Sequence, residues 1–177
     1  VPYKEISFPA DEQTSPILDF DGQAHVVLFT RRVGRGAREL VARRLSSSGA
    51  WIDPAPLILT PNRSAAATAQ IPGGGLLVAE MSATTVADYR VYGQRIEQTG
   101  SVADAGVWAN PFTAASSVHL ACATSHCGLL FEQSNSYAGT VVSHQGAVLT
   151  PSNVYVPALS FARNVELHGV GDAMAVV

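Results

Sequence analysis

A ten-residue pattern that recurs along the chain constrains the fold more than any other feature. It reads Arg-x-x-x-x-Gly-x-φ-x-Asp, where φ is apolar, and its first two copies span residues 44–53 and 95–104. A third copy, at 141–149, keeps the glycine and the flanking apolar residues but has neither the arginine nor the aspartate. The residues that define the copies are Arg44, Gly49 and Asp53, then Arg95, Gly100 and Asp104, then Gly146. The glycines are 51 and 46 residues apart, and regular spacing of this size indicates a repeat architecture.

Short apolar segments surround each copy and predict β-strands. Four pairs of such segments, each joined by a tight turn, have the pattern of β-hairpins at 17–29, 67–79, 118–131 and 165–177. After each of the first three hairpins, a third strand leads to the repeat glycine and a fourth strand follows it. Proline and glycine interrupt every candidate helix, so we expect an all-β chain built from units of four antiparallel strands.

Four-stranded units of about 46–51 residues, joined in series, are typical of the blades of a β-propeller. The repeat pattern resembles that of secreted bacterial β-propeller repeat proteins, whose blades carry such a motif after the third strand. The resemblance covers nearly the whole chain and implies a propeller fold with a secreted or cell-surface location in a bacterium. The Gly-His and Trp-Asp signatures of WD40 blades do not occur in the sequence. We expect the Arg and Asp of the pattern to link strand to strand or blade to blade.

The number of strands predicts an incomplete ring. We expect a lone outer strand at 1–9, blades at 15–60, 65–112 and 116–158, and a half blade at 163–177. Propellers typically close with about four to eight blades. The expected partner is therefore the remainder of a larger propeller chain or a second copy. The other possibility is that the four units close tightly with one defective blade.

The two cysteines of the chain, Cys122 and Cys127, flank the turn of the third hairpin. Strand ends across such a turn can lie within the Cα separation that a disulfide requires, so we predict a disulfide and an oxidising compartment. The rival interpretation is a metal site that also uses His126. It offers only three ligands and no second cysteine pair, and we predict neither a metal nor a cofactor.

Composition narrows the choice of partners. The net charge is −3, and the basic residues form no stripe beyond the segment from Arg31 to Arg44. Nucleic-acid binding requires a concentrated positive face, so we expect no nucleic-acid partner. No apolar run approaches the roughly 18–20 residues of a spanning helix, so we expect no membrane span.

The sequence contains no motif that identifies a catalytic residue. Gly-x-Ser-x-Gly is absent, and the carboxylates Glu80 and Glu132 follow their strands at corresponding positions, which indicates a repeated structural role. His119 and His168 also occupy corresponding positions, and we interpret them in the same way. We predict no catalytic residue, and the ligand-binding residues remain unassigned.

Three hypotheses for the function follow. The first is a non-catalytic propeller module of a secreted or surface protein, which binds protein or glycan or acts as an assembly scaffold. The second is part of a glycan-active hydrolase or lyase whose catalytic residues lie partly outside this chain. The third is a half-ring that homodimerises into a closed propeller. Trp51 and Trp108 fit packing between blades or, as the alternative, a groove that stacks carbohydrate.

Overall fold

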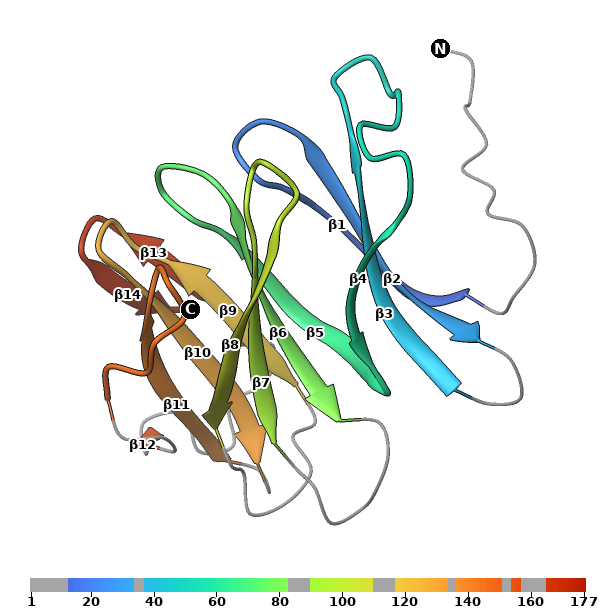
Figure 1. Ribbon diagram of the computed structural model, residues 1–177. Coiled ribbons are helices and arrows are strands. Elements are labelled where there is room, and N and C mark those ends of the chain that lie inside the picture. Colours follow the sequence, from blue (N-terminus) through green and yellow to red (C-terminus); the bar gives the residue numbers. More distant parts are fainter. Residues whose placement is uncertain are drawn as a thin grey trace.

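The computed structural model of the chain describes residues 13–33, 37–82, 90–109, 117–133, 136–150, 154–156 and 165–177. Within these ranges every regular element is a β-strand, which confirms the prediction of an all-β chain (Figure 1). No helix long and apolar enough to cross a membrane occurs in these ranges. The strand expected at 1–9 lies outside the described residues.

The strands form three four-stranded antiparallel sheets and one hairpin, and within each sheet the strand order follows the chain order. The first sheet comprises β1 (Gln13–Phe20), β2 (His25–Val33), β3 (Ala37–Leu45) and β4 (Leu57–Pro61). The second sheet comprises β5 (Arg63–Gln70), β6 (Leu76–Ser82), β7 (Val91–Ile96) and β8 (Val102–Ala109). The third sheet comprises β9 (Val118–Cys122), β10 (His126–Gln133), β11 (Ser136–Ser143) and β12 (Val154–Val156). The hairpin comprises β13 (Leu167–Val170) and β14 (Ala173–Val176).

The three repeat glycines follow the third strand of each sheet in the same kind of turn. Gly49, Gly100 and Gly146 have φ angles of 76°, 89° and 86°, a left-handed conformation that glycine adopts without the steric cost of a side chain. In each turn the glycine N–H donates to the carbonyl oxygen three residues earlier, at 2.8–2.9 Å. The recurring pattern therefore encodes one local structure in three places.

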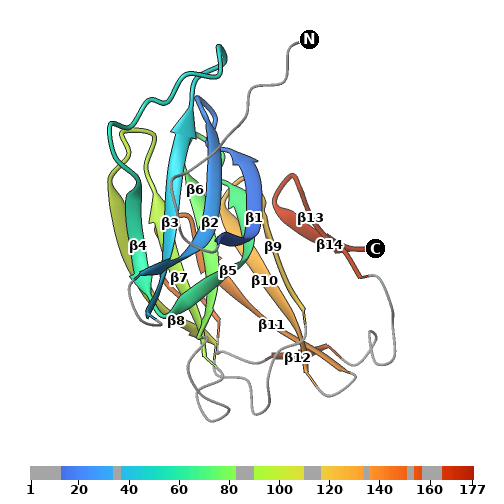
Figure 2. The same cartoon turned by 90° about the vertical axis from the view of Figure 1, so that its right-hand side faces the viewer.

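The sheets stack face to face (Figures 1 and 2). Two apolar cores lie between them. Val26, Leu28, Leu40 and Ala42 of the first sheet pack against Leu76, Val78 and Ile96 of the second. The opposite face of the second sheet packs against the third through a larger cluster that includes Leu77, Trp108, Leu129 and Phe131. A small cluster around Leu130 and Leu167 joins the hairpin to the other face of the third sheet.

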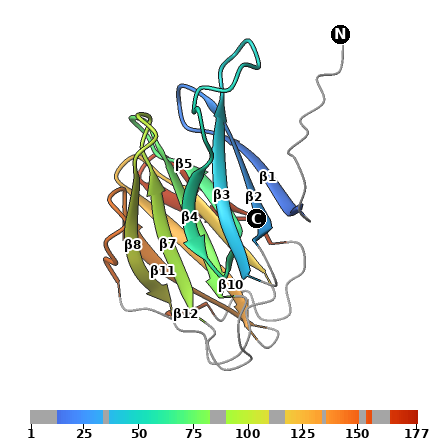
Figure 3. The same cartoon turned by 45° about the vertical axis from the view of Figure 1, so that its right-hand side comes forward.

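The first strands of successive sheets are neighbours in space. β5 contacts both β1 and β9, and β9 contacts β13. Asn62 alone separates β4 from β5, so the chain passes directly from the last strand of one sheet to the first strand of the next (Figure 3). The result is a propeller-like stack of sheets, which does not close into a ring within the described residues.

Candidate functional site

The first copy of the repeat pattern forms a joint between the first and second sheets. Arg44 and Asp53 form a buried ion pair, with Nη2 2.5 Å from Oδ1. Asp53 Oδ2 also accepts the backbone N–H of Arg44 at 3.0 Å. The guanidinium then donates to the carbonyl oxygens of Gln98 and Thr99 in the turn of the second sheet. The pair therefore links strands within one sheet and links that sheet to the next.

The second copy does not repeat this ion pair. Arg95 Nη2 lies 3.0 Å from Glu97 Oε2 instead. Asp104 Oδ1 accepts the backbone N–H of Gly106 at 2.9 Å, which keeps the aspartate in a local turn. The same residue types at the same spacing thus make different contacts, because Asp104 lies within β8 opposite Gln94 whereas Asp53 precedes β4.

The joint between the second and third sheets depends on Trp108. This side chain is completely buried. Its indole Nε1 donates to the carbonyl oxygen of Gly146 at 2.8 Å. Packing of Trp108 between blades was predicted from the sequence, but its role as a hydrogen-bond donor was not. The sequence signal for this hydrogen bond was the position of Trp108 near the end of a predicted fourth strand, close to the turn of the next unit.

The third copy keeps the backbone arrangement of the first without its charges. Thr150 lies four residues after Gly146, as Asp53 lies four residues after Gly49. Thr150 Oγ1 accepts the backbone N–H of Val141 at 2.9 Å. A hydroxyl therefore performs the backbone contact that the carboxylate of Asp53 performs in the first sheet, and an apolar side chain stands in place of Arg44.

A pocket of about 240 Å³ lies where this third copy meets the hairpin. Thr150 contributes to its wall, and none of the described residues that line it is charged. The lining is mainly aliphatic, and it includes two glycines, of which Gly128 is covered by Met174 and Leu167 of the hairpin. Its principal members are Gly128, Leu130, Gly139, Val141, Leu167 and Met174.

A buried polar cluster lies between the first and second sheets. The carboxylate of Glu80 has no exposure to solvent, and it accepts hydrogen bonds from Thr60 Oγ1 and, at 3.3 Å, from Arg63 Nη1. Gln94 Nε2 donates to Thr60 Oγ1 at 3.0 Å. Burial raises the pKa of Glu80, while the hydrogen bonds from Thr60 and Arg63 act in the opposite direction. The carboxylate joins strands of two sheets.

The two corresponding histidines have different surroundings. His119 is partly buried, its ring centroid lies 6.5 Å from that of Tyr137, and burial lowers its pKa. His168 is exposed, and its Nε2 lies 3.1 Å from Glu166 Oε2. A corresponding position in the repeat therefore does not give these two side chains a common environment.

Aromatic side chains near the turns are paired with arginines or buried. The guanidinium carbon of Arg43 lies 4.2 Å from the ring centroid of Trp51. That of Arg63 lies 3.4 Å from the ring centroid of Tyr92. Because Trp108 is buried in the core, the two tryptophans do not form a shared exposed surface for carbohydrate stacking.

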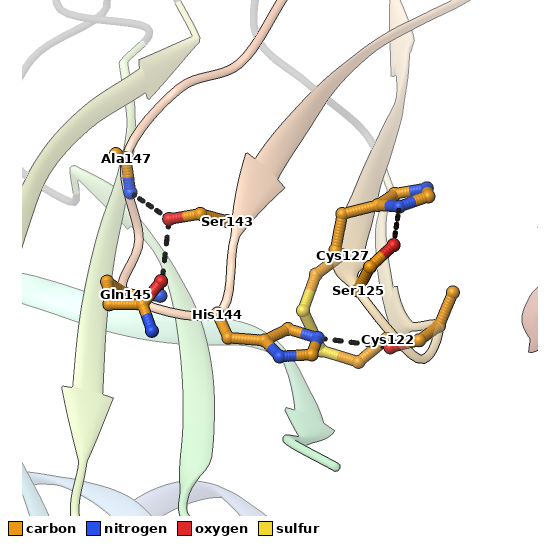
Figure 4. Close-up of a disulfide and its surroundings, with 9 residues drawn as sticks. Cys122, Ser125, Cys127, Ser143, His144, Gln145 and Ala147 are labelled. Carbon is orange, nitrogen blue, oxygen red and sulfur yellow. Dashed lines mark hydrogen bonds between the residues drawn. A yellow bond between two sulfur atoms is a disulfide. The ribbon is translucent and has the colours of Figure 1, made fainter. Parts of the chain in front are cut away.

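Cys122 and Cys127 face each other across β9 and β10 and form a disulfide (Figure 4). His144 Nε2 lies 3.0 Å from the carbonyl oxygen of Ala123, so a residue after β11 is tied to the turn next to the disulfide. In the part of the chain that the structure describes, no three His, Cys, Asp or Glu side chains gather as a metal site would require.

Comparisons with known proteins give little further guidance. No protein-family model and no curated protein matches the chain. One similar solved structure is that of a mutant puromycin hydrolase complexed with PGG, with a TM-score of 0.34 and 14% sequence identity. The match covers 93% of this chain and 32% of that protein, so the chain spans about a third of its length.

Proposed function

We propose that this chain is a non-catalytic module of a β-propeller in a secreted or surface protein, and that it acts as an assembly scaffold. On this proposal the four-stranded sheets are blades, and further sheets pack on both ends of the stack. The observation that carries the proposal is that both ends of the stack present apolar surface. The disulfide is compatible with an extracellular location, because disulfides persist in oxidising environments.

At one end, the edge strands of the first sheet turn apolar side chains toward solvent, whereas Phe29 and Val41 in the middle of the same face are buried. Leu18 is 67% exposed and Ile58 is 56% exposed. The adjacent residues Ile17, Leu57 and Leu59 pack toward the second sheet. Side chains alternate between the faces of a strand, so Leu18 and Ile58 belong to the outer face. These two residues lie on the two edge strands of the sheet, and exposed apolar groups of this kind favour association with another surface.

At the other end, the third sheet is covered by a two-stranded hairpin. Each face that is buried between complete sheets in this chain is covered by four strands. The apolar pocket beside Val141 lies between the third sheet and the hairpin, whose Leu167 and Met174 contribute to its wall. The two ends therefore both offer surface for a further sheet.

Light scattering at a series of protein concentrations tests the scaffold proposal. We expect the average mass to rise above the 18.5 kDa of the monomer as the concentration increases. The double variant Leu18→Glu/Ile58→Glu should shift this rise to higher concentration, because burying a charge at an apolar contact is costly. Ala103→Glu, at an exposed position of β8, is the matched control and should leave the association unchanged.

Two results would contradict the proposal. One is a mass that stays at the monomer value over the whole concentration range. The other is turnover of a glycan by the purified chain, which would overturn its non-catalytic part and favour the hydrolase or lyase hypothesis.

A further inference from the structure

We infer that His119 is a pH-sensitive switch that controls whether the hairpin of β13 and β14 stays docked on the third sheet. When the neutral imidazole takes up one proton from mildly acidic solution, the hairpin leaves the sheet and uncovers the face beneath it. The inference concerns a conformational change of the chain, and it does not depend on the proposed scaffold function.

The position of His119 places its side chain in the interface between the third sheet and the hairpin. His119 lies on β9, directly opposite Leu130 of β10. Directly opposite residues of an antiparallel pair share one face of the sheet. Leu130 packs with Val165 and Leu167, so this face is turned toward the hairpin. β13 lies beside β9 and β10 (Figures 1 and 2). The imidazole is therefore partly buried by the hairpin that it controls.

The neighbours of the imidazole in this interface do not favour a positive charge. Leu130 and Tyr137 are each 4% exposed and belong to the same apolar cluster. The ring centroid of Tyr137 lies 6.5 Å from that of His119, and the rings are tilted by 48°. A cation is attracted to the face of an aromatic ring within about 6 Å, so Tyr137 stabilises an imidazolium only weakly. Burying an unpaired charge among such groups is costly.

Two carboxylates act on His119, and both also interact with other groups. Glu132 of β10 has its Oε2 3.5 Å from the hydroxyl oxygen of Ser117. The side chain of Glu166, just before β13, is 72% exposed and pairs with His168 at 3.1 Å. Water and the other partners weaken the attraction of these carboxylates for a charge on His119. The remaining titratable groups of the hairpin and of β10, Asp172 and His126, lie at the turn end of the interface.

The hairpin is held by few contacts. At its turn, the backbone N–H and the Oγ1 of Thr124 donate to the carbonyl oxygen of Gly171, at 2.7 Å and 2.9 Å. At the other end, the cluster of Leu130, Tyr137, Val165 and Leu167 is smaller than either cluster between complete sheets. An element with so little buried surface opens at a low free-energy cost, so a single ionisation can change whether it stays docked.

The direction of the pH effect follows from the burial of the imidazole. Burial lowers the pKa of His119 below its ordinary value of 6.5, while Glu166 and Glu132 act in the opposite direction. Above pH 6.5 the imidazole is neutral whether the hairpin is docked or released, so docking is unaffected. As the pH falls below 6.5, the released form takes up the proton more readily, and docking weakens until the pH is below the pKa of the docked form.

Nuclear magnetic resonance of carbon-13 in the methyl groups of the two methionines tests the inference. Met174 of β14 lies against the third sheet, since a Cβ added to Gly128 would be 3.1 Å from Met174 Cγ. We expect the ratio of released to docked Met174 signal to rise several-fold between about pH 7.5 and about pH 5.5. Gly169→Val supplies the signal of a released hairpin, because its side chain would collide with the carbonyl oxygen of Cys122.

Three variants assign the response to one imidazole. His119→Gln cannot take up the proton, and its hairpin should stay docked at both pH values. His119→Lys carries a charge at both pH values, and its hairpin should be released at both. His168→Gln is the matched control, because it removes the histidine at the corresponding position of the hairpin and should keep the pH response. The signal of Met81, on β6, shows whether each variant keeps the second sheet folded.

A Met174 signal that stays docked at about pH 5.5 in the unmodified protein would overturn the inference. The same conclusion follows if His119→Gln responds to pH as the unmodified protein does, because another group would then be responsible. The spectra are recorded at two protein concentrations. A response that grows with concentration would assign the change to association and would also contradict the inference, whereas equal responses support release of the hairpin within one chain.

Discussion

Gly93 shows how one missing side chain permits a contact between sheets. A Cβ at this position on β7 would overlap the indole ring of Trp108. The space above Gly93 allows that ring to be buried, and burial brings its Nε1 to the carbonyl oxygen of Gly146. Glycine within a strand lowers its stability, and here the contact that Trp108 makes between two sheets offsets that loss.

Gly93→Ala is expected to lower the free energy of unfolding by roughly 1–3 kcal/mol, the usual cost of inserting a methyl group into a packed core. Urea unfolding of the two proteins measures the difference. In a Trp108→Leu background the same substitution should cost much less, because the ring it collides with is gone. Equal costs in both backgrounds would show that the collision with the indole is not the cause.

Glu80 is expected to make stability depend on pH. Burial raises its pKa above the ordinary value of 4.5. A carboxyl with a raised pKa in the folded state stabilises the fold below pH 4.5, and this contribution is lost as the pH rises through the folded-state pKa. We therefore expect Tm to fall less between pH 4.5 and pH 8 in Glu80→Gln than in the unmodified protein. Thermal melts across this range provide the measurement, and parallel profiles would contradict the expectation.

At the scale of elements, β5 links one sheet to the next. Only Asn62 separates it from β4, and β5 shifts its register against β6 between Ala65 and Ala67. A bulge bends its strand, and here it lies in the strand that begins directly after the first sheet ends and is the first strand of the second. β1 has a register shift against β2 at a similar place, between Thr14 and Ile17.

The disulfide staples the hairpin of β9 and β10 at its turn. Cys122→Ala/Cys127→Ala is expected to lower the free energy of unfolding by about 2 kcal/mol, because the loop that the bond closes is short. The fold should persist, since four further residue pairs hold β9 and β10 in register. Denaturant unfolding with far-ultraviolet circular dichroism checks both points. Loss of β-structure in the double variant would mean that the bond determines the fold.

The strands and turns could be predicted from the sequence because their signals are local. Apolar runs, tight turns and the left-handed glycines at 49, 100 and 146 each depend on a few adjacent residues. The joints could not be predicted in the same way. Arg95 and Asp104 have the spacing of Arg44 and Asp53, yet they make other contacts, and Thr150 replaces an aspartate. Those outcomes depend on where the fourth strand begins, since Asp104 lies within β8 opposite Gln94 whereas Asp53 precedes β4.

For the molecule as a whole, the second sheet is the most enclosed element. Leu76 and Val78 face the first sheet, while Leu77 and Ala79 face the third, and all four are completely buried. On the outer face of the first sheet Leu18 and Ile58 are exposed, while Phe29 and Val41 are buried. Stability is therefore expected to decrease from the centre of the stack toward its ends.

Native-state hydrogen exchange can measure this gradient. We expect the amides of β6 and β7 to exchange most slowly and those of β13 and β14 to exchange fastest, because the hairpin contributes few buried side chains. Uniform protection over all three sheets and the hairpin would show instead that the stack opens as one cooperative unit.

The difference in chemistry between successive joints has a consequence for folding. Chains of similar repeats are prone to pair the wrong neighbours while they fold. Here the guanidinium of Arg44 binds the turn of the second sheet, and the indole N–H of Trp108 binds the turn of the third sheet. In the third sheet, the position that corresponds to Arg44 is the aliphatic Val141. A turn suited to one of these surfaces leaves unpaired polar groups or a collision at another, which disfavours the wrong pairing. The different contacts at each joint thus favour the pairing of each sheet with its correct neighbour.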